Sequence, residues 1–245
     1  MSTFTNGNVS IYYEERGSGP ALLLLPPGGM NATVSFWARS PFLPHEVFAD
    51  EYRTVAMDQR NAGSSRGPLD VNDPWNGYID DQLALMDHLG IERFHVMGCC
   101  IGCSYALLLA QRTPDRVLSA VLEQPIGVVE SNRQMWPNSF QDWAKQLLDK
   151  RGDLNMADAE AFGRKMWSGD FVLAVTRDWL KTCDTPFLVL PGSDTAHPHE
   201  IGVEVAELAP RAEIMDPWKT PELTGAAIQR IRAFLQAHTP AGVSR

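Results

Sequence analysis

Three of the four cysteines in the 245-residue chain lie within five positions, at Cys99, Cys100 and Cys103. Cysteines at such spacing can bind a metal, form a redox pair, supply a nucleophile, or fill a core as small apolar residues. Their neighbours favour the nucleophile. The stretch from Gly98 to Gly102 has the form Gly-x-nucleophile-x-Gly, and it lies between an apolar run typical of a strand and a segment with helical spacing.

A turn of this form exposes one thiol. The turn is tight, so the residues two before and two after its centre must be very small, and Gly98 and Gly102 meet that condition. The central Cys100 points out of the turn at the carboxyl edge of the sheet, and the helix N-terminus behind it favours the thiolate. We therefore expect Cys100 to be the nucleophile and the backbone N–H of Ile101 to point to the same place.

The other cysteines have simpler interpretations. Cys99 and Cys103 are not at the apex of the turn, and we interpret both as buried apolar residues. Cys100 and Cys103 also form a C-x-x-C pair, which suits a thiol–disulfide protein, but such a pair does not need the flanking glycines. A zinc site needs a second ligand pair at metal-like spacing, and only Cys183 and one pair of histidines remain. We expect no metal.

Composition narrows the class of partner. The formal net charge is -9 and no run of basic residues occurs, which argues against nucleic acid or an anionic membrane as the main partner. The longest apolar run, ALLLLPP, is too short to span a bilayer, and the N-terminus lacks the pattern of a signal peptide. We therefore expect a cytoplasmic protein that acts on a small-molecule substrate without a cofactor; the sequence leaves its oligomeric state open.

Apolar runs and helical segments alternate along most of the chain, which predicts an α/β fold with a mainly parallel sheet covered by helices on both faces. Residues 126–180 interrupt the alternation with three helical stretches, at 141–150, 157–167 and 170–180. We expect this segment to be a lid inserted into a core of residues 1–125 and 181–245. Strands are expected at 9–15 (as an edge strand), 21–27, 52–58, 94–98, 117–124, 185–192 and 212–217, and helices at 77–90, 103–114 and 222–238.

Further motifs resemble the α/β-hydrolase superfamily over nearly the whole chain. LLLLPPGGM resembles its strand and oxyanion loop, MDQRNAGSS its Asp-x-Arg-x-x-Gly-x-Ser turn, and LPGSDTAHP the loop that carries its catalytic acid. The resemblance implies the α/β-hydrolase fold, a second oxyanion donor at Gly28 or Gly29 with Gly29 preferred, and Asp194 as the acid. A cysteine at the elbow is a minority pattern, in which the chain resembles the dienelactone hydrolases.

The chain departs from the superfamily pattern at its histidine. The catalytic histidine of these enzymes usually follows the last strand, but residues 212–223 contain none and carry Trp218 and Lys219 instead. A thiol nucleophile normally needs a base beside it. We expect His197, three residues after Asp194, to be that base. Lys219 is the alternative, either as a cation that stabilises the thiolate or as a base with a lowered pKa.

The acid and the substrate-binding residues have several candidates. Glu123 ends a strand at the place where haloalkane dehalogenases, among others, carry their acid, so it competes with Asp194 for that role. The lid is rich in large side chains, most of which are expected to pack on the core, while some would line an apolar substrate pocket. The candidates for that pocket are Phe36, Trp136, Trp143, Trp167 and Trp218.

The resemblance implies hydrolysis of a small ester, thioester or lactone through a thioacyl intermediate on Cys100. The missing histidine keeps a second interpretation open, in which a protein of the same fold acts as a lyase or isomerase, or binds a ligand without turnover. A third interpretation is a thiol redox protein that uses Cys100 and Cys103.

Overall fold

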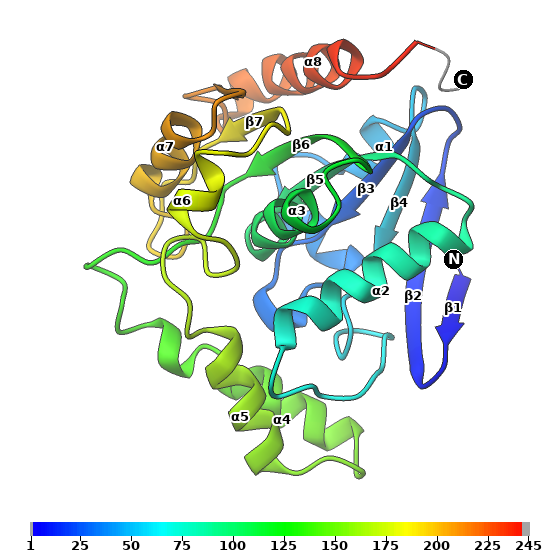
Figure 1. Ribbon diagram of the computed structural model, residues 1–245, viewed down its shortest axis with the longest axis vertical. Coiled ribbons are helices and arrows are strands. Elements are labelled where there is room, and N and C mark those ends of the chain that lie inside the picture. The colour runs from blue at the N-terminus through cyan, green and yellow to red at the C-terminus, as the bar shows by residue number, and fades with distance from the viewer. Residues whose placement is uncertain (1, 242–245) are drawn as a thin grey trace.

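A central sheet of eight strands carries helices on both faces in the computed structural model, which describes residues 2–241 (Figure 1). The strands are β1 (Ser2–Asn6), β2 (Val9–Arg16), β3 (Ala21–Leu25), β4 (Arg53–Met57), β5 (Phe94–Cys99), β6 (Val117–Glu123), β7 (Phe187–Leu190) and β8 (Ala212–Ile214). Their order is β1-β2-β4-β3-β5-β6-β7-β8. The strands from β4 to β8 in this order run parallel, and β1 and β2 pair antiparallel. The predicted fold class is confirmed.

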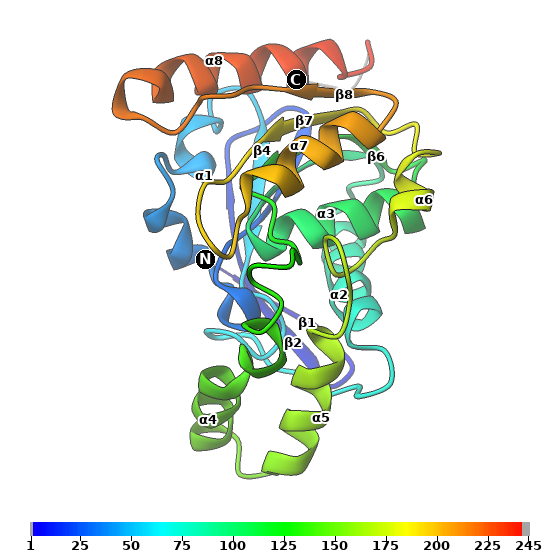
Figure 2. The same ribbon diagram turned by 90° about the vertical axis from the view of Figure 1, so that its left-hand side faces the viewer.

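The helices divide between the two faces of the sheet (Figure 2). α2, α3 and α7 cover one face, and α1 and α8 cover the other. The α-helices are α1 (Pro44–Val47), α2 (Pro74–His88), α3 (Ile101–Arg112), α4 (Gln141–Lys150), α5 (Met156–Met166), α6 (Arg177–Leu180), α7 (His199–Leu208) and α8 (Pro221–Ala237), and the 3-10 helices are η1 (Gly29–Asn31), η2 (Val34–Arg39) and η3 (Trp136–Asn138). No helix within residues 2–241 combines the length and the apolar character needed to cross a membrane.

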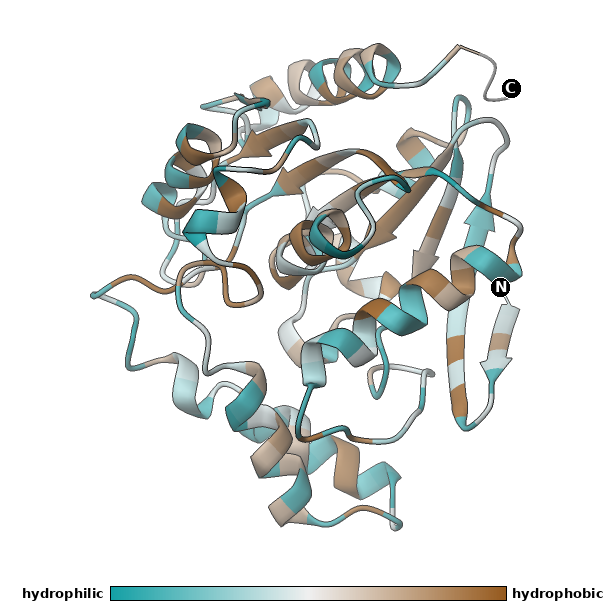
Figure 3. Ribbon diagram, viewed as in Figure 1, coloured by the Kyte–Doolittle hydropathy of each residue, from teal (hydrophilic) through white to brown (hydrophobic). Residues whose placement is uncertain are grey.

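Burial on both faces explains the continuous apolar strands. All five residues of β3 are buried, with Leu23 and Leu25 in the core under α2 and α3 and Leu22 and Leu24 in the core under α8. Figure 3 shows the hydropathy of these elements. The central strands are almost wholly hydrophobic, whereas hydrophobic and hydrophilic residues alternate along the outer helices. A strand covered on both faces needs no polar alternation. Because β3, β5 and β6 run parallel, their carboxyl ends lie at one edge of the sheet, where the elbow lies.

The strand over 9–15 was expected at the edge of the sheet, and that prediction is wrong. β1 pairs with β2 along its outer side, from Ser2 opposite Tyr13 to Asn6 opposite Val9. β1 buries only Phe4, so its sequence STFTN lacks the apolar alternation that identifies a strand. The hairpin turn that joins the two strands contains Gly7 with φ 60°, a conformation that glycine adopts readily. Helix α7, between β7 and β8, was also not predicted.

The segment between β6 and β7 contains η3, α4, α5 and α6 and no strand. In Figure 1, α4 and α5 extend beyond the sheet. The helix expected over 170–180 is restricted to Arg177–Leu180. Phe171 and Leu173 have φ values of 54° and 69°, which a right-handed helix excludes. Instead, the carbonyl of Phe171 accepts a hydrogen bond from the Val128 N–H at 2.7 Å.

Candidate active site

The turn between β5 and α3 holds Cys100 in a strained conformation. Its φ and ψ are 59° and -121°, a combination that a residue with a side chain keeps only where its surroundings fix it. The Cys100 N–H donates to the Glu123 carbonyl at 3.0 Å. A Cβ on Gly98 would come within 2.2 Å of the Gly102 oxygen, and a Cβ on Gly102 within 2.1 Å of the Leu25 oxygen. Both glycines are therefore required by close backbone contacts.

The three clustered cysteines differ in exposure. Cys100 is partly exposed, while Cys99 and Cys103 are buried. Burial raises the pKa of the Cys99 and Cys103 thiols well above the ordinary value. The Cys103 thiol donates to the Gly98 and Glu123 carbonyls at 3.2 and 3.3 Å. Cys103 therefore points into the backbone beneath the elbow.

The surroundings of Cys100 favour its thiolate. Burial works to raise the pKa of this thiol, but the His197 side chain and the N–H groups of Gly28 and Ile101 outweigh it, so the pKa lies below the ordinary value. Of the two candidate glycines, Gly28 is the one whose backbone contributes to this lower pKa, whereas the sequence analysis preferred Gly29, which begins η1. Backbone donors of this kind stabilise negative charge on the sulfur.

His197 lies between Cys100 and Asp194. Its Nδ1 is 2.8 Å from Asp194 Oδ1, which also accepts the N–H groups of Ala196 and His197, each at 3.0 Å. Burial lowers the pKa of His197, but Cys100 and Asp194 together raise it above the ordinary value. His197 Nε2 is buried and has no aligned hydrogen-bond partner among residues 2–241. Besides Asp194, the neighbour that raises the pKa of this imidazole is Cys100.

The glycine at position 192 allows the loop after β7 to hold both Asp194 and His197 in this arrangement. A Cβ on Gly192 would lie 2.3 Å from the His197 Cβ and 2.4 Å from the His197 oxygen. No side chain can occupy that position unless His197 moves. The sequence analysis missed this requirement, although the motif LPG just before Ser193 contained its signal.

Glu123 has a different environment from Asp194. It is completely buried at the end of β6, and neither carboxylate oxygen has a hydrogen-bond partner within residues 2–241. Burial raises the pKa of Glu123 to about 8, with smaller opposing effects from Ser40, Lys219 and His197. A carboxyl group with this pKa is mostly protonated at neutral pH. Of the two candidate acids, only Asp194 hydrogen-bonds His197.

The two candidates after β8 form hydrogen bonds with other groups. The ammonium of Lys219 donates to Gln124 Oε1. Trp218 is buried in the core under α8, and its Nε1 donates to the Pro191 carbonyl at 2.7 Å. The expectation that Trp218 lines the substrate pocket is therefore corrected, because its ring fills the core and its only polar atom is satisfied there.

Two of the predicted aromatic residues adjoin the oxyanion loop. The Phe36 ring lies 3.0 Å from the position of a Cβ on Gly28, and the Trp167 ring lies 3.7 Å from that of a Cβ on Gly29. Trp136 stacks on Trp167, with ring centroids 5.1 Å apart. Phe36 and Trp167 therefore lie against the loop after β3, and Trp136 joins them through its stack on Trp167.

Trp143 has another position. It stacks on Phe162 of α5 at 5.6 Å, and its Nε1 donates to the Asn61 carbonyl at 3.3 Å. Trp143 therefore packs α4 against α5 and attaches both helices to the loop after β4.

A family model described as the alpha/beta hydrolase fold matches residues 21–184, which include the elbow, the loop after β3 and all of residues 126–180. The chain belongs to the α/β-hydrolase-fold family. This confirms the superfamily predicted from the motifs.

Several known proteins resemble the chain. It is 41% identical over 123 residues to a fluoroacetate dehalogenase from a Burkholderia species, which covers 48% of this chain and 38% of that protein. It is 28% identical over 210 residues to an N-formylmaleamate deformylase from Pseudomonas putida, which covers 83% of this chain and 74% of that protein. The chain thus spans less than half the length of the dehalogenase.

One solved structure illustrates the fold of the family. A meta-cleavage product hydrolase from Pseudomonas fluorescens IP01 superimposes with a TM-score of 0.73 at 22% identity, over 98% of both chains. At this identity the likeness concerns the fold.

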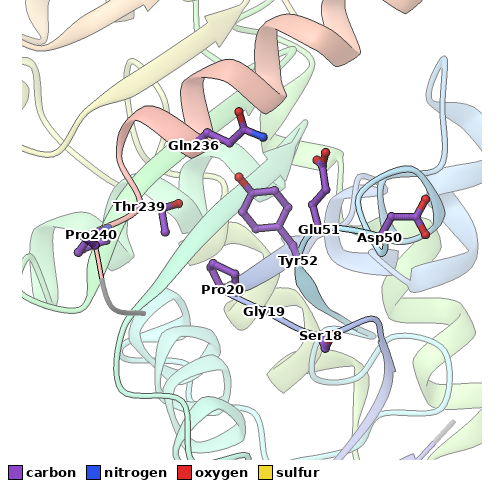
Figure 4. Close-up of a pocket in the computed structure, with 10 residues that line it drawn as sticks. Ser18, Gly19, Pro20, Asp50, Glu51, Tyr52, Gln236, Thr239 and Pro240 are labelled. Carbon is purple, nitrogen blue, oxygen red and sulfur yellow. The ribbon is translucent and has the colours of Figure 1, made fainter. Parts of the chain in front are cut away.

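Figure 4 shows a surface groove whose lining includes no residue of the elbow. It has a volume of about 710 Å³ and lies where β3 and β4 begin, with Pro20, Tyr52 and Thr239 among its lining residues. Ligand sites in α/β sheets lie at the opposite edge, where the strands end. None of the candidate site residues lines this groove. Within residues 2–241, no group of three or more His, Cys, Asp or Glu side chains is arranged to hold a metal ion.

Proposed function

We propose that the chain is a hydrolase that cleaves a small ester, thioester or lactone with Cys100 as its nucleophile. The observation that carries the proposal is the position of His197, whose imidazole acts on the Cys100 thiol while Asp194 binds its other ring nitrogen. A nucleophile, a base and a group that orients the base are the three parts that acyl transfer requires.

The first half of the reaction acylates the cysteine. The Cys100 thiolate attacks the substrate carbonyl, a carbon–sulfur bond forms, and the carbonyl electron pair moves to the oxygen. The N–H groups of Ile101 and Gly28 bind that oxyanion, an interaction worth about 3 kcal/mol of barrier per donor. When the tetrahedral species collapses, the alcohol or thiol leaves with the proton that His197 Nε2 held.

The second half releases the acid. Water attacks the thioacyl carbonyl while His197 takes one of its protons, and the carbon–sulfur bond breaks as the carbonyl re-forms. The Cys100 thiolate is regenerated beside a protonated His197. These steps balance without a metal or a cofactor.

The comparisons support a hydrolase, but they do not identify the bond that it cleaves, so that bond is inferred from the site. The related proteins bear the names of a dehalogenase, a deformylase and a meta-cleavage product hydrolase, so the family cleaves several kinds of bond. A thiolate between two backbone donors suits an acyl carbon. We also propose that residues 126–180 act as the lid of this site, and that the partner is a small molecule rather than nucleic acid or membrane, in keeping with the net charge of -9.

Acylation by an activated substrate tests the proposal. Phenyl thioacetate should give a burst of thiophenol, and mass spectrometry should locate an acetyl group on Cys100. Cys100→Ala should abolish the burst. Cys103→Ala is the matched control and should retain it, whereas a thiol redox protein would need both cysteines. The absence of acetylation on Cys100 in the wild type would contradict the proposal and favour a non-hydrolytic member of the family.

A further inference from the structure

Two hydrogen-bond donors near the elbow are buried and unused. They are the indole N–H of Trp167, a residue 6% exposed, and the hydroxyl of Tyr105, a residue 0% exposed. Neither Trp167 Nε1 nor the Tyr105 hydroxyl has a partner within residues 2–241. Because buried polar groups in native proteins nearly always have partners, an acceptor from outside the chain would satisfy this pair.

Trp167 adjoins the oxyanion loop. Its ring atoms lie 3.7 and 3.8 Å from the position that a Cβ on Gly29 would take. Gly29 directly follows Gly28, whose N–H lies beside the Cys100 sulfur. The unused N–H of Trp167 therefore belongs to the immediate surroundings of the nucleophile.

Tyr105 is linked to the same place through Trp75. Tyr105 lies on α3, five residues after Cys100, and its ring centroid is 5.3 Å from that of Trp75. Trp75 Nε1 donates at 3.1 Å to the carbonyl of Met166, the residue before Trp167. One side chain of α2 thus connects the two unused donors across the boundary between core and lid.

Charge and shape limit what can accept from these donors. Arg60, whose charge acts on the neighbouring Tyr78, is already bound to both oxygens of Asp81 at 2.6 and 2.7 Å. This arginine therefore offers no counter-charge to a buried carboxylate on the ligand, and the charge of a protonated His197 is already shared between Cys100 and Asp194, which disfavours a carboxylate. The stack of Trp136 on Trp167 presents flat aromatic surface beside the donor.

We propose that the acyl part of the substrate is a flat, unsaturated group with a neutral oxygen acceptor, such as a ketone or ether, and that this oxygen takes the hydrogen bonds of Trp167 and Tyr105. This inference rests on the proposed function, since it names the substrate class of the same site.

Binding of matched probes to the Cys100→Ala protein tests the inference without turnover. Acetophenone carries a neutral oxygen, α-methylstyrene replaces that oxygen with a methylene group of similar shape, and benzoate carries a charge. Calorimetry should give a dissociation constant for acetophenone at least tenfold below those of the other two. Tyr105→Phe and Trp167→Phe should each reduce the preference for acetophenone over α-methylstyrene about fivefold, the usual effect of one hydrogen bond. Tyr52→Phe, at the groove in Figure 4, is the matched control and should retain it.

The inference is overturned by equal binding of the three probes, by tighter binding of benzoate, by no acetophenone binding at millimolar concentration, or by a preference that survives both substitutions. A preference that survives would mean that Ile101 and Gly28 hold the oxygen instead. The thioacetate burst of the wild type reports separately on hydrolysis. A missing burst with an intact probe preference would overturn the proposed function and leave the binding inference standing.

Discussion

The Nδ1 atom of His197 lies 2.8 Å from Oδ1 of Asp194, three residues earlier in the same loop. The proposed base and acid therefore both follow β7, whereas the resemblance implies a histidine after the last strand. Backbone N–H bonds from Ala196 and His197 to Asp194 close this loop on itself. The orientation of the imidazole is thus set locally, and it does not depend on the segment after β8, where Lys219 binds Gln124.

Replacing His197 should disable the thiol. His197→Ala removes the group that lowers the pKa of Cys100, so the thiolate becomes scarcer at neutral pH. Turnover should fall by about 10² to 10⁴, and alkylation of Cys100 by iodoacetamide should shift to higher pH. His199→Ala is the matched control, because His199 pairs with Asp216 at 2.6 Å and its side chain is 53% exposed. Equal turnover in the wild type and His197→Ala would rule out His197 as the base.

Removing the charge of Asp194 should act through His197. The Asp194 carboxylate contributes to raising the pKa of His197, so Asp194→Asn should lower that pKa. A less basic imidazole stabilises the Cys100 thiolate less, and the apparent pKa of alkylation should rise. Turnover should fall at least tenfold, since the imidazole also loses its orientation. Asp216→Asn is the control, and an unchanged alkylation profile in Asp194→Asn would transfer the role of the acid to another group.

A methyl group at position 192 should displace His197, the proposed base, while leaving its imidazole chemically unchanged. In Gly192→Ala, the new Cβ would lie 2.3 Å from the His197 Cβ, so the imidazole must move away from Cys100. Displacement of a catalytic group by about 1 Å can reduce turnover about 10²-fold. Gly225→Ala on α8 has nothing within 4 Å of its Cβ and should keep full turnover. Full turnover in Gly192→Ala would show that the loop can relax without moving His197.

The elbow and the central sheet could be predicted because their signals are local. The five apolar residues of β3 indicate a strand buried on both faces, and all five are buried. The spacing of Gly98 and Gly102 indicates a tight turn, and both glycines have backbone contacts that exclude a Cβ. These features follow from chain geometry over a few residues, which a sequence displays directly.

Other features depend on contacts between distant segments. Trp218 looked like a pocket residue, but its ring fills the core under α8, and its indole N–H binds the Pro191 carbonyl. Gly28, rather than Gly29, contributes the backbone effect that lowers the pKa of Cys100. The direction of a side chain or an N–H group after a strand is set by packing, so the sequence identified these loops but not the group that each presents.

Replacing Glu123 with a residue that cannot ionise should change how the free energy of unfolding depends on pH. The pKa of Glu123 is about 8 in the folded protein, against 4.5 for an ordinary glutamate, because of its burial. The stability that this group contributes is fully present below pH 4.5, where folded and unfolded chains both hold the proton. Above that pH the unfolded chain releases its proton while the folded chain retains it, so stability falls by about 1.4 kcal/mol per pH unit until pH 8.

Glu123→Gln keeps the shape of the side chain and cannot ionise, so the variant should escape this loss. Urea unfolding at pH 5, 6.5 and 8 should show that the free energy of unfolding of the variant, relative to that of the wild type, increases at each step. Glu207→Gln on the exposed side of α7 controls for the substitution itself. A difference between Glu123→Gln and the wild type that stays constant from pH 5 to 8 would mean that Glu123 is already ionised when folded. Lys219 or His197 would then have to balance its charge, and the site would carry one more negative charge beside the Cys100 thiolate.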